Sequence, residues 1–280
     1  MTTPQAKIID GKALAEQVLL TIKERIDETK HHPGLAAIIV GNDPASLLYV
    51  RNKKRAAQKV GIDFHEYRCE QQTTPVKIIE MIQWLNADNA IDGIIVQLPL
   101  PATLPTQKII EAIAPHKDVD GFHPLHHAAD TSDSLQITSP LINAIRVALE
   151  STGEILKDKT AVVVSKSPVF SKPLVAALAE YGIIAHEVTP DNNLGNHTRN
   201  ADILVSVVGK KHYITADLIK PHAILIDVGT TMSADGTWHG DIDPAASTIA
   251  DWITPVPGGI GPLTVAMLIK NTYELSCRNQ

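Results

Sequence analysis

The sequence has little cysteine, few aromatic residues and no excess of positive charge. Among its 280 residues are two cysteines, Cys69 and Cys277, which match neither a metal-ligand spacing nor a disulfide framework. Lys and Arg total 25 against 31 Asp and Glu, so binding to nucleic-acid phosphates is not expected. No apolar stretch approaches the ~18 residues of a membrane span. The charged N-terminus also lacks the apolar core of a signal peptide. We therefore expect a cytoplasmic protein without nucleic-acid or membrane partners.

Short apolar runs alternate with amphipathic helices along the chain. The runs predict buried strands at residues 35–40, 91–96, 161–164, 203–208 and 223–228. Strands buried on both faces and separated by helices form parallel sheets, and an aromatic content of only 4% fits their aliphatic cores. At roughly 150 residues per domain, the length favours two α/β domains. The irregular segment 114–139, rich in Pro, His and Asp, is expected to join them.

Tyr49 and Lys53 are four residues apart on the helix expected after residue 40, so they project from one face. Lys53 could belong with Arg51, Lys54 and Arg55 to a solvated basic face, which the spacing alone favours. Alternatively it lies over a cleft as an acid or base. That role requires a pKa lowered by burial or by neighbouring cations. Tyr49 would then stack on a planar substrate.

Further polar residues stand where ligand contacts are common. Gln97 follows the strand at residues 91–96, and open α/β sheets bind ligands at the carboxyl ends of strands, although a glutamine there can also simply bond to a loop. Asp118 and Asp120 are either turn formers, which the local sequence favours, or one of them holds a basic heterocycle. The segment 255–262 has three glycines and three prolines and predicts a rigid loop that permits close backbone approach.

These motifs occur in a characteristic order. They are Asn42–Ser46 leading to Tyr49 and Lys53, then Gln97–Pro99, Lys117–Phe122, Ile226–Gly229 and Ile253–Gly259. The series resembles the bifunctional methylenetetrahydrofolate dehydrogenase/methenyltetrahydrofolate cyclohydrolase family over essentially the whole chain. The resemblance implies oxidation of 5,10-methylenetetrahydrofolate with NADP and hydrolysis of the methenyl product to 10-formyltetrahydrofolate. It also implies a homodimer formed by the nucleotide-binding domains.

The resemblance further implies a division of roles between domains. An N-terminal catalytic, folate-binding domain would span residues 1–139 plus 262–280, a Rossmann-like NAD(P)-binding domain would span 140–261, and a cleft would lie between them. The implied catalytic residues are Lys53, which transfers protons, Gln97, which bonds to it, and Asp120, which anchors the pterin ring. Tyr49 would stack on the aminobenzoate group, and the folate would be bordered by Pro257, Gly258 and Gly259.

The nucleotide-binding half departs from the family's pattern. Where the family has a loop beginning Gly-Arg-Ser, with a second glycine four residues beyond the serine, this chain has Ser165, Lys166, Ser167 and Ser171. If the backbone keeps a positive φ there, each serine costs on the order of 1 kcal/mol. Its Cβ would also crowd a pyrophosphate. Lys166 keeps the charge of an arginine without the planar two-point fork. His222 also stands where a glycine is usual.

The cofactor preference is left open by a second departure. The family's His-Ser-x-Thr segment is replaced by Thr189–Asn192, and Asp191 lies about 20 residues after Ser171. A carboxylate at that spacing binds a ribose 2′-hydroxyl and repels a 2′-phosphate, although a turn aspartate explains it equally well. NADP is therefore the cofactor implied by resemblance, with NAD possible. The predicted cofactor residues are Ser165, Lys166, Ser167, Asp191, Gly209 and Thr230.

Three hypotheses follow. The chain is a bifunctional NADP enzyme, a cyclohydrolase with a weak or NAD-preferring dehydrogenase, or a folate-binding protein without turnover. The presence of Lys53, Tyr49, Gln97 and Asp120 disfavours the third. The 12 histidines do not predict a metal site. His116, His123, His126 and His127 are loosely spaced, without a regular element to orient their rings.

Overall fold

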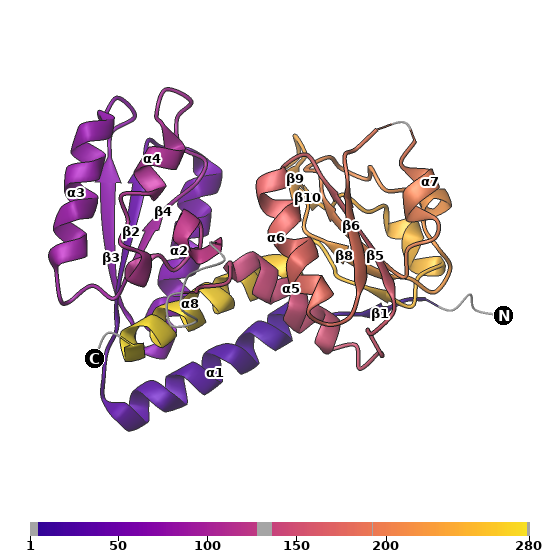
Figure 1. Cartoon of the computed structure of the whole chain (residues 1–280), viewed down its shortest axis with the longest axis horizontal. Helices are drawn as coiled ribbons and strands as arrows, with labels where there is room; N and C mark the ends of the chain where they lie inside the picture. The colour runs from indigo at the N-terminus through magenta and orange to yellow at the C-terminus, as the bar shows by residue number, and fades with distance from the viewer. Residues whose placement is uncertain (1–4, 128–135, 192, 279–280) are drawn as a thin grey trace. The chain divides into compact units, whose positions relative to one another are not determined.

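The chain folds into two compact units, each built on a parallel sheet. The computed structural model describes residues 5–127, 136–191 and 193–278. The N-terminal unit comprises Ala15–Pro140 and Val265–Gln280, and the C-terminal unit comprises Met1–Leu14 and Leu141–Thr264. In each unit helices lie along the sheet (Figure 1). The predicted two-domain α/β class is confirmed. Over the described ranges, no helix combines the length and apolar character that crossing a membrane requires.

The N-terminal unit has, in its described part, three parallel strands in the order β3, β2, β4. These are β2 (Gly34–Val40), β3 (Asp63–Cys69) and β4 (Gly93–Val96). The helices are α2 (Pro44–Val60), α3 (Pro75–Ala87) and α4 (Thr106–Ile110), followed by the 3-10 turns η1 (Pro115–Lys117) and η2 (Pro124–His127). Helices α1 (Gly11–Thr29) and α8 (Ile260–Arg278) are each divided between the two units.

Strand β2 explains why its sequence is an uninterrupted apolar run. Alternate residues of a strand point to opposite faces of the sheet. Ala36 and Ile38 belong to a cluster that includes Ile78 and Ile82 of α3, whereas Ile39 packs with Val50 of α2. The strand is therefore covered on both faces, and every one of its residues is buried.

The C-terminal unit has six parallel strands among its described residues, in the order β1, β11, β8, β7, β5, β6. They are β1 (Lys7–Ile8), β5 (Thr160–Ser165), β6 (Ile184–Val188), β7 (Ile203–Val207), β8 (Ile224–Asp227) and β11 (Trp252–Ile253). The helices and turns are α5 (Pro140–Glu150), α6 (Pro168–Ala179), α7 (Gly195–Thr198), η4 (Ala216–Leu218) and η5 (Pro244–Thr248). A short hairpin joins β9 (Thr231–Met232) to β10 (Trp238–His239).

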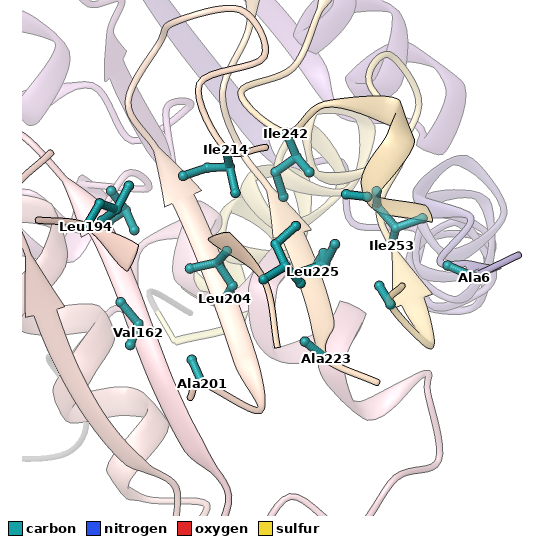
Figure 2. Packing of buried hydrophobic residues seen from close by; sticks show 14 of the residues in the cluster. Ala6, Val162, Leu194, Ala201, Leu204, Ile214, Ala223, Leu225, Ile242 and Ile253 are labelled. Atoms are coloured by element: carbon teal, nitrogen blue, oxygen red, sulfur yellow. The ribbon is translucent and has the colours of Figure 1, made fainter. Parts of the chain in front are cut away.

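One face of this sheet forms an aliphatic core. Val162, Leu204, Leu225 and Ile253 come from four different strands of the sheet and belong to one cluster (Figure 2). Ile214 and Ile242, from loops, extend the same cluster. The core therefore contains small and branched aliphatic side chains, as the low aromatic content indicated.

The first residues of the chain belong to a different unit from the one that the predicted domain boundaries give them. Those boundaries place residues 1–139 in the catalytic domain, whereas Met1–Leu14 belong to the C-terminal unit. The reason is that β1 adds to the edge of the second sheet, pairing in parallel with β11 through Lys7 and Trp252. A strand of two residues is too short to leave a periodic signal in the sequence.

The apolar runs did not indicate β3 and β6, which are edge strands. Each pairs with one neighbour only, within the described residues, and most residues of each strand are exposed or half-buried. Polar residues are tolerated at such positions, so these strands lack the continuous apolar signal. In the irregular segment 114–139, the described part contains η1 and η2, and residues 128–135 lie outside the described residues.

Gly34 provides a test of the packing beside β2. A Cβ added at Gly34 would lie 1.8 Å from the carbonyl oxygen of Ala90, which is a backbone atom. Because backbone must move, Gly34→Ala should lower the free energy of unfolding by roughly 1–3 kcal/mol in denaturant titrations. Gly261→Ala is the control, since an added Cβ there meets no described atom within 4 Å. Equal stabilities for the two variants would contradict this packing.

Candidate active site

Helix α2 places Tyr49 and Lys53 on the same side of the helix, as predicted. Asp43 caps its start by accepting a hydrogen bond from the Ser46 N–H at 2.8 Å, and Pro44 occupies the first turn. The helix ends at Gly61, whose φ of 94° is left-handed. With both ends defined, Tyr49, which is 37% exposed, lies one turn before the half-buried Lys53.

Lys53 is held by Gln97. Its Nζ donates to Oε1 of Gln97 at 3.0 Å, and Nε2 of Gln97 donates to the Leu98 carbonyl at 2.6 Å. Gln97 is buried and comes directly after β4, where its N–H continues the sheet by donating to the Ile38 carbonyl. Both ends of the amide are therefore engaged, so the side chain presents its oxygen to Lys53.

The segment from Lys117 to Asp120 places a carboxylate near Lys53. Lys117 is buried, and its Nζ donates to the carbonyls of Leu85 and Asp88 at 3.2 and 2.8 Å, beside the end of α3. Burial lowers the pKa of Lys117. Val119 is fully buried, and its carbonyl accepts a hydrogen bond from Asn271 of α8 at 2.9 Å. The segment is therefore anchored at two points.

Asp118 forms the turn itself. Its carboxylate accepts hydrogen bonds from the N–H groups of Asp120 and Gly121 at 3.2 Å and of His123 at 2.7 Å. His126 lies on the same carboxylate, with Nε2 at 3.3 Å from Oδ2. Nδ1 of His126 accepts a hydrogen bond from the Ile137 N–H at 3.3 Å. The turn interpretation is thus correct for Asp118.

Asp120 has a different environment. Among the described residues its carboxylate accepts no hydrogen bond, and it interacts electrostatically with Lys53. Burial raises the pKa of Asp120, while the Lys53 ammonium opposes that shift and the Asp118 carboxylate adds to it. Burial likewise lowers the pKa of Lys53, against the attraction of Asp120. Both shifts favour the uncharged forms, so a proton can leave or join this pair more readily than in water.

The other basic residues of α2 do not share this site. Arg51, Lys54 and Arg55 line a separate groove of about 440 Å³. Its full lining is Ile39, Leu47, Val50, Arg51, Lys54, Arg55, Gln58, Glu66 and Arg68. Lys54 lies 3.8 Å from Glu66, while Arg51 and Arg55 are exposed. The solvated basic face therefore exists, but Lys53 lies outside it.

In the C-terminal unit, the loop after β5 runs into α6. Oγ of Ser165 accepts a hydrogen bond from the Ser167 N–H at 3.0 Å, and Lys166 is exposed. Neither Ser165 nor Ser171 has a positive φ. The condition for backbone strain is therefore not met, because Ser165 ends a strand and Ser171 lies within α6. His222 does adopt a φ of 67°, which explains why a glycine suits that position.

Comparison with known proteins identifies the family to which both domains of this chain belong. Residues 9–120 match the catalytic-domain model described as tetrahydrofolate dehydrogenase/cyclohydrolase, and residues 140–280 match the NAD(P)-binding domain of the same family. The chain belongs to the tetrahydrofolate dehydrogenase/cyclohydrolase family. It is 41% identical to the bifunctional protein FolD of Methylibium petroleiphilum, over 96% of this chain and 97% of that protein. The resemblance predicted from the motifs is thereby confirmed.

Solved structures agree with this family assignment. A bifunctional FolD from Campylobacter jejuni has a TM-score of 0.91 and 31% identity, covering 98% of this chain and all of that one. FolD of Trypanosoma brucei, crystallised with NADP cofactor and inhibitor, has a TM-score of 0.92 and 30% identity, and 98% of each chain is covered. The fold of this chain is therefore that of tetrahydrofolate dehydrogenase/cyclohydrolases along nearly its whole length.

The remaining predicted residues of this family member lie in the C-terminal unit. Gly258 and Gly259 are buried, Gly258 has a φ of 113°, and its carbonyl accepts from the Lys12 N–H at 3.0 Å. A tight connection thus accounts for the two glycines, and their contact with folate stays a prediction, as it does for the exposed Pro257. Asp191 accepts from the Asn193 N–H at 2.8 Å, which supports the turn interpretation.

Two buried carboxylates shape the loops of the family's NAD(P)-binding domain. Asp241 accepts from the N–H groups of Val208 and Lys210 at 2.6 and 2.8 Å, which positions Gly209 between them. Gly209 has a φ of 69°, and no described atom lies within 4 Å of a Cβ added there. Asp227 accepts from the N–H groups of Gly229, Asp241 and Ile242, next to the exposed Thr230. Sequence patterns did not reveal this network, since its members are distant in the chain.

The described residues contain no group of three His, Cys, Asp or Glu side chains that could hold a metal ion. Of the loop histidines, His126 accepts a hydrogen bond from the Ile137 N–H and lies beside the Asp118 carboxylate. The imidazole of His123 accepts a hydrogen bond from the Leu125 N–H at 3.2 Å. These contacts give both rings structural roles within the tetrahydrofolate dehydrogenase/cyclohydrolase fold.

The Asp227 network predicts a pH dependence of stability. Burial raises the pKa of Asp227 to about 7 from 3.8, although the N–H groups of Ile242 and Asp241 oppose the shift. Because its pKa is raised in the folded protein, Asp227 contributes stability that is complete below pH 3.8 and is lost as the pH rises through about 7. The difference in unfolding free energy between Asp227→Asn and the parent chain should therefore change over this interval in denaturant titrations.

Asp202→Asn is the control for this titration. Although burial opposes it, hydrogen bonds from Lys220 and Thr160 lower the pKa of Asp202 to about 2. The stability that Asp202 contributes is complete above pH 3.8 and is lost only as the pH falls towards 2. The difference in unfolding free energy between Asp202→Asn and the parent chain should therefore stay constant between pH 4 and 7. A constant difference for Asp227→Asn as well would contradict the raised pKa.

Proposed function

We propose that this chain oxidises 5,10-methylenetetrahydrofolate with NADP and hydrolyses the 5,10-methenyl product to 10-formyltetrahydrofolate. The observation that carries this proposal is the juxtaposition of Lys53, Gln97 and Asp120 in a catalytic domain of this family. The FolD relatives are bifunctional by name, and one was crystallised with NADP. This chain spans nearly their whole length, so it contains both of the domains that the two reactions require.

Lys53 is the group that transfers protons in the hydrolysis. Water adds to the methenyl carbon, and the adduct opens to the formyl product only after a proton leaves oxygen and another reaches the departing nitrogen. An ordinary lysine remains charged at neutral pH and cannot accept a proton. Burial lowers the pKa of Lys53, which makes both of its protonation states accessible. Gln97 keeps the Nζ in one position by accepting its hydrogen bond.

Asp120 binds the pterin ring. A carboxylate can accept two parallel hydrogen bonds from the ring nitrogen and the neighbouring amino group of a pterin. Asp120 is suited to this because no described residue already donates to its carboxylate. When ionised, its carboxylate also favours the positively charged methenyl form of the substrate. Tyr49 supplies an exposed ring, one helical turn from Lys53, on which the aminobenzoate group stacks.

In the C-terminal unit, Lys166 fits NADP in charge and Gly209 fits it in space. Lys166 is exposed beside the first turn of α6 and pairs with phosphate, while Gly209 leaves open space at a loop that Asp241 holds. Ser165, Ser167, Asp191 and Thr230 complete the proposed cofactor contacts. When bound, NADP accepts the hydride that leaves the one-carbon bridge. This chain's contribution to that step is to position the substrate through Asp120 and Tyr49.

Three further assignments rest on the family resemblance. We propose that Pro257, Gly258 and Gly259 border the bound folate, that the NAD(P)-binding domains form a homodimer, and that the protein acts in the cytoplasm. The buried glycines support the first of these, since a backbone without side chains permits close approach of a ligand.

Lys53→Met tests the catalytic assignment. Loss of the proton carrier should reduce hydrolysis of methenyltetrahydrofolate by on the order of 100-fold or more. The reaction is followed by the absorbance of the methenyl group. Lys54→Met is the matched control, because Lys54 lies in the separate groove beside Glu66 and should leave hydrolysis unchanged. Unchanged hydrolysis in Lys53→Met, with folding intact, would remove the assigned role.

The same assay separates the three hypotheses. Formation of the methenyl form is measured with NADP and with NAD, and its hydrolysis is measured without nucleotide. Hydrolysis without reduction of either nucleotide would contradict the bifunctional proposal. Absence of all three reactions, with folate still bound, would instead favour a binding protein.

Asp120→Asn tests the pterin contact. The variant keeps the shape of the side chain but loses the charge and one acceptor, so the KM for the folate substrate should rise roughly 10- to 100-fold. The affinity for NADP, measured by calorimetric titration without folate, should not change. An unchanged folate KM would show that the pterin is bound elsewhere.

A further inference from the structure

The carboxylate bonded to the first turn of α6, next to the loop that carries Lys166, is that of Glu187. We propose that Glu187 is a specificity-determining residue whose carboxylate favours the ribose 2′-hydroxyl of NAD and disfavours the 2′-phosphate of NADP. This inference rests on the proposed function of the C-terminal unit as a nucleotide site. As a consequence, this chain discriminates less strongly in favour of NADP than it would if Lys166 acted alone.

The position of Glu187 in the sheet is the first support. Glu187 is the penultimate residue of β6, the strand that follows β5 and α6 in the chain. In dinucleotide-binding folds an acidic residue near the end of this second strand accepts hydrogen bonds from the adenosine ribose. Glu187 lies 16 residues after Ser171, close to the spacing of about 20 residues that this role requires.

The register of β6 directs the side chain towards α6. Glu187 pairs with Val163 of β5, whereas Val188 pairs with Val164. Val164 and Val188 both belong to the core on one face of the sheet, so Glu187 points to the opposite face. Helix α6 packs against β5 and β6, and its first turn contains Ser171.

The hydrogen bond from Ser171 is the second support. The Ser171 hydroxyl donates to Oε2 of Glu187, which places the carboxylate at the start of α6, beside the loop that carries Lys166. Ser171 is almost completely buried, whereas Glu187 is exposed. A glycine at 171 could not make this bond. The serine at this position therefore orients a negative charge towards the cofactor loop.

Asp191 is less suited to the same task. Its carboxylate is already engaged by the Asn193 N–H in a turn. Lys166 has the opposite effect from Glu187, since its exposed ammonium attracts a 2′-phosphate. Lys166 lies in the loop before α6, and Glu187 is bonded to Ser171 in the first turn of that helix, so the cofactor preference reflects the balance of the two charges.

Glu187→Gln tests the proposal by binding, without any turnover. NADP and NAD are titrated separately into the folate-free full-length protein in a calorimeter. The ratio of the NADP Kd to the NAD Kd should fall about tenfold, equivalent to about 1.4 kcal/mol. The effect should shrink at high salt, because exposed charges are screened. Adenosine 2′,5′-bisphosphate and adenosine 5′-monophosphate should show the same change, which locates it at the 2′ position.

Two further variants complete the experiment. Glu180→Gln removes a carboxylate at the opposite end of α6, near Arg146, and should leave the ratio unchanged. Ser171→Gly removes the orienting hydroxyl and should shift the ratio in the same direction as Glu187→Gln. An unchanged ratio in Glu187→Gln, or an equal shift in Glu180→Gln, would overturn the proposal.

Hydrolysis of methenyltetrahydrofolate distinguishes this outcome from a failure of the proposed function. It does not need the nucleotide, so normal hydrolysis in Glu187→Gln shows that the variant is folded. If the parent chain binds both nucleotides but lacks hydrolysis, the proposed function fails while the Kd ratio still tests Glu187. If the parent chain binds neither nucleotide, both proposals are overturned.

Discussion

The candidate active site depends on one buried carboxylate, that of Asp118. It accepts hydrogen bonds from three backbone N–H groups and lies 3.3 Å from Nε2 of His126, so the chain from Asp118 to His123 has a single arrangement. Without it, the N–H groups of a turn that is buried against β4 would lack partners, which costs more than an ordinary hydrogen bond contributes. The position of Asp120 opposite Lys53 follows from this turn. The chemistry of the site is thus set by a residue that need not touch the substrate.

The C-terminal unit uses the same device. Asp227 and Asp241 accept six hydrogen bonds between them, five from backbone N–H groups and one from Ser206. Gly229 and Gly240 permit this, since a Cβ at either position would lie 2.0 Å from one of the carboxylates. In both units, loops at the carboxyl ends of parallel strands are built around buried acids. Such loops stay irregular in backbone and yet well defined, as a binding site requires.

Sequence patterns predicted the interior strands and the α2 face with Tyr49 and Lys53, because burial on both sides and helical spacing leave local signals. They also placed Gln97 correctly at the end of β4. They did not reveal β3 and β6, whose exposed edges admit polar residues, or the short β1. The positive φ that would strain Ser165 and Ser171 does not occur, since φ depends on the elements that contain these residues. Spacing pointed to Asp191, whereas the register of β6 points to Glu187.

The sequence by itself determined the fold class, the family and the residue types available for catalysis, since these depend on periodicity and on motifs read along the chain. Only the tertiary structure decided which of several similar residues has which role. Lys53 differs from Lys54, and Asp120 from Asp118, through burial and hydrogen-bond partners from distant segments. The physical reason is that a pKa, a hydrogen bond and a local field depend on distance in space. Residues adjacent in sequence can therefore have opposite environments.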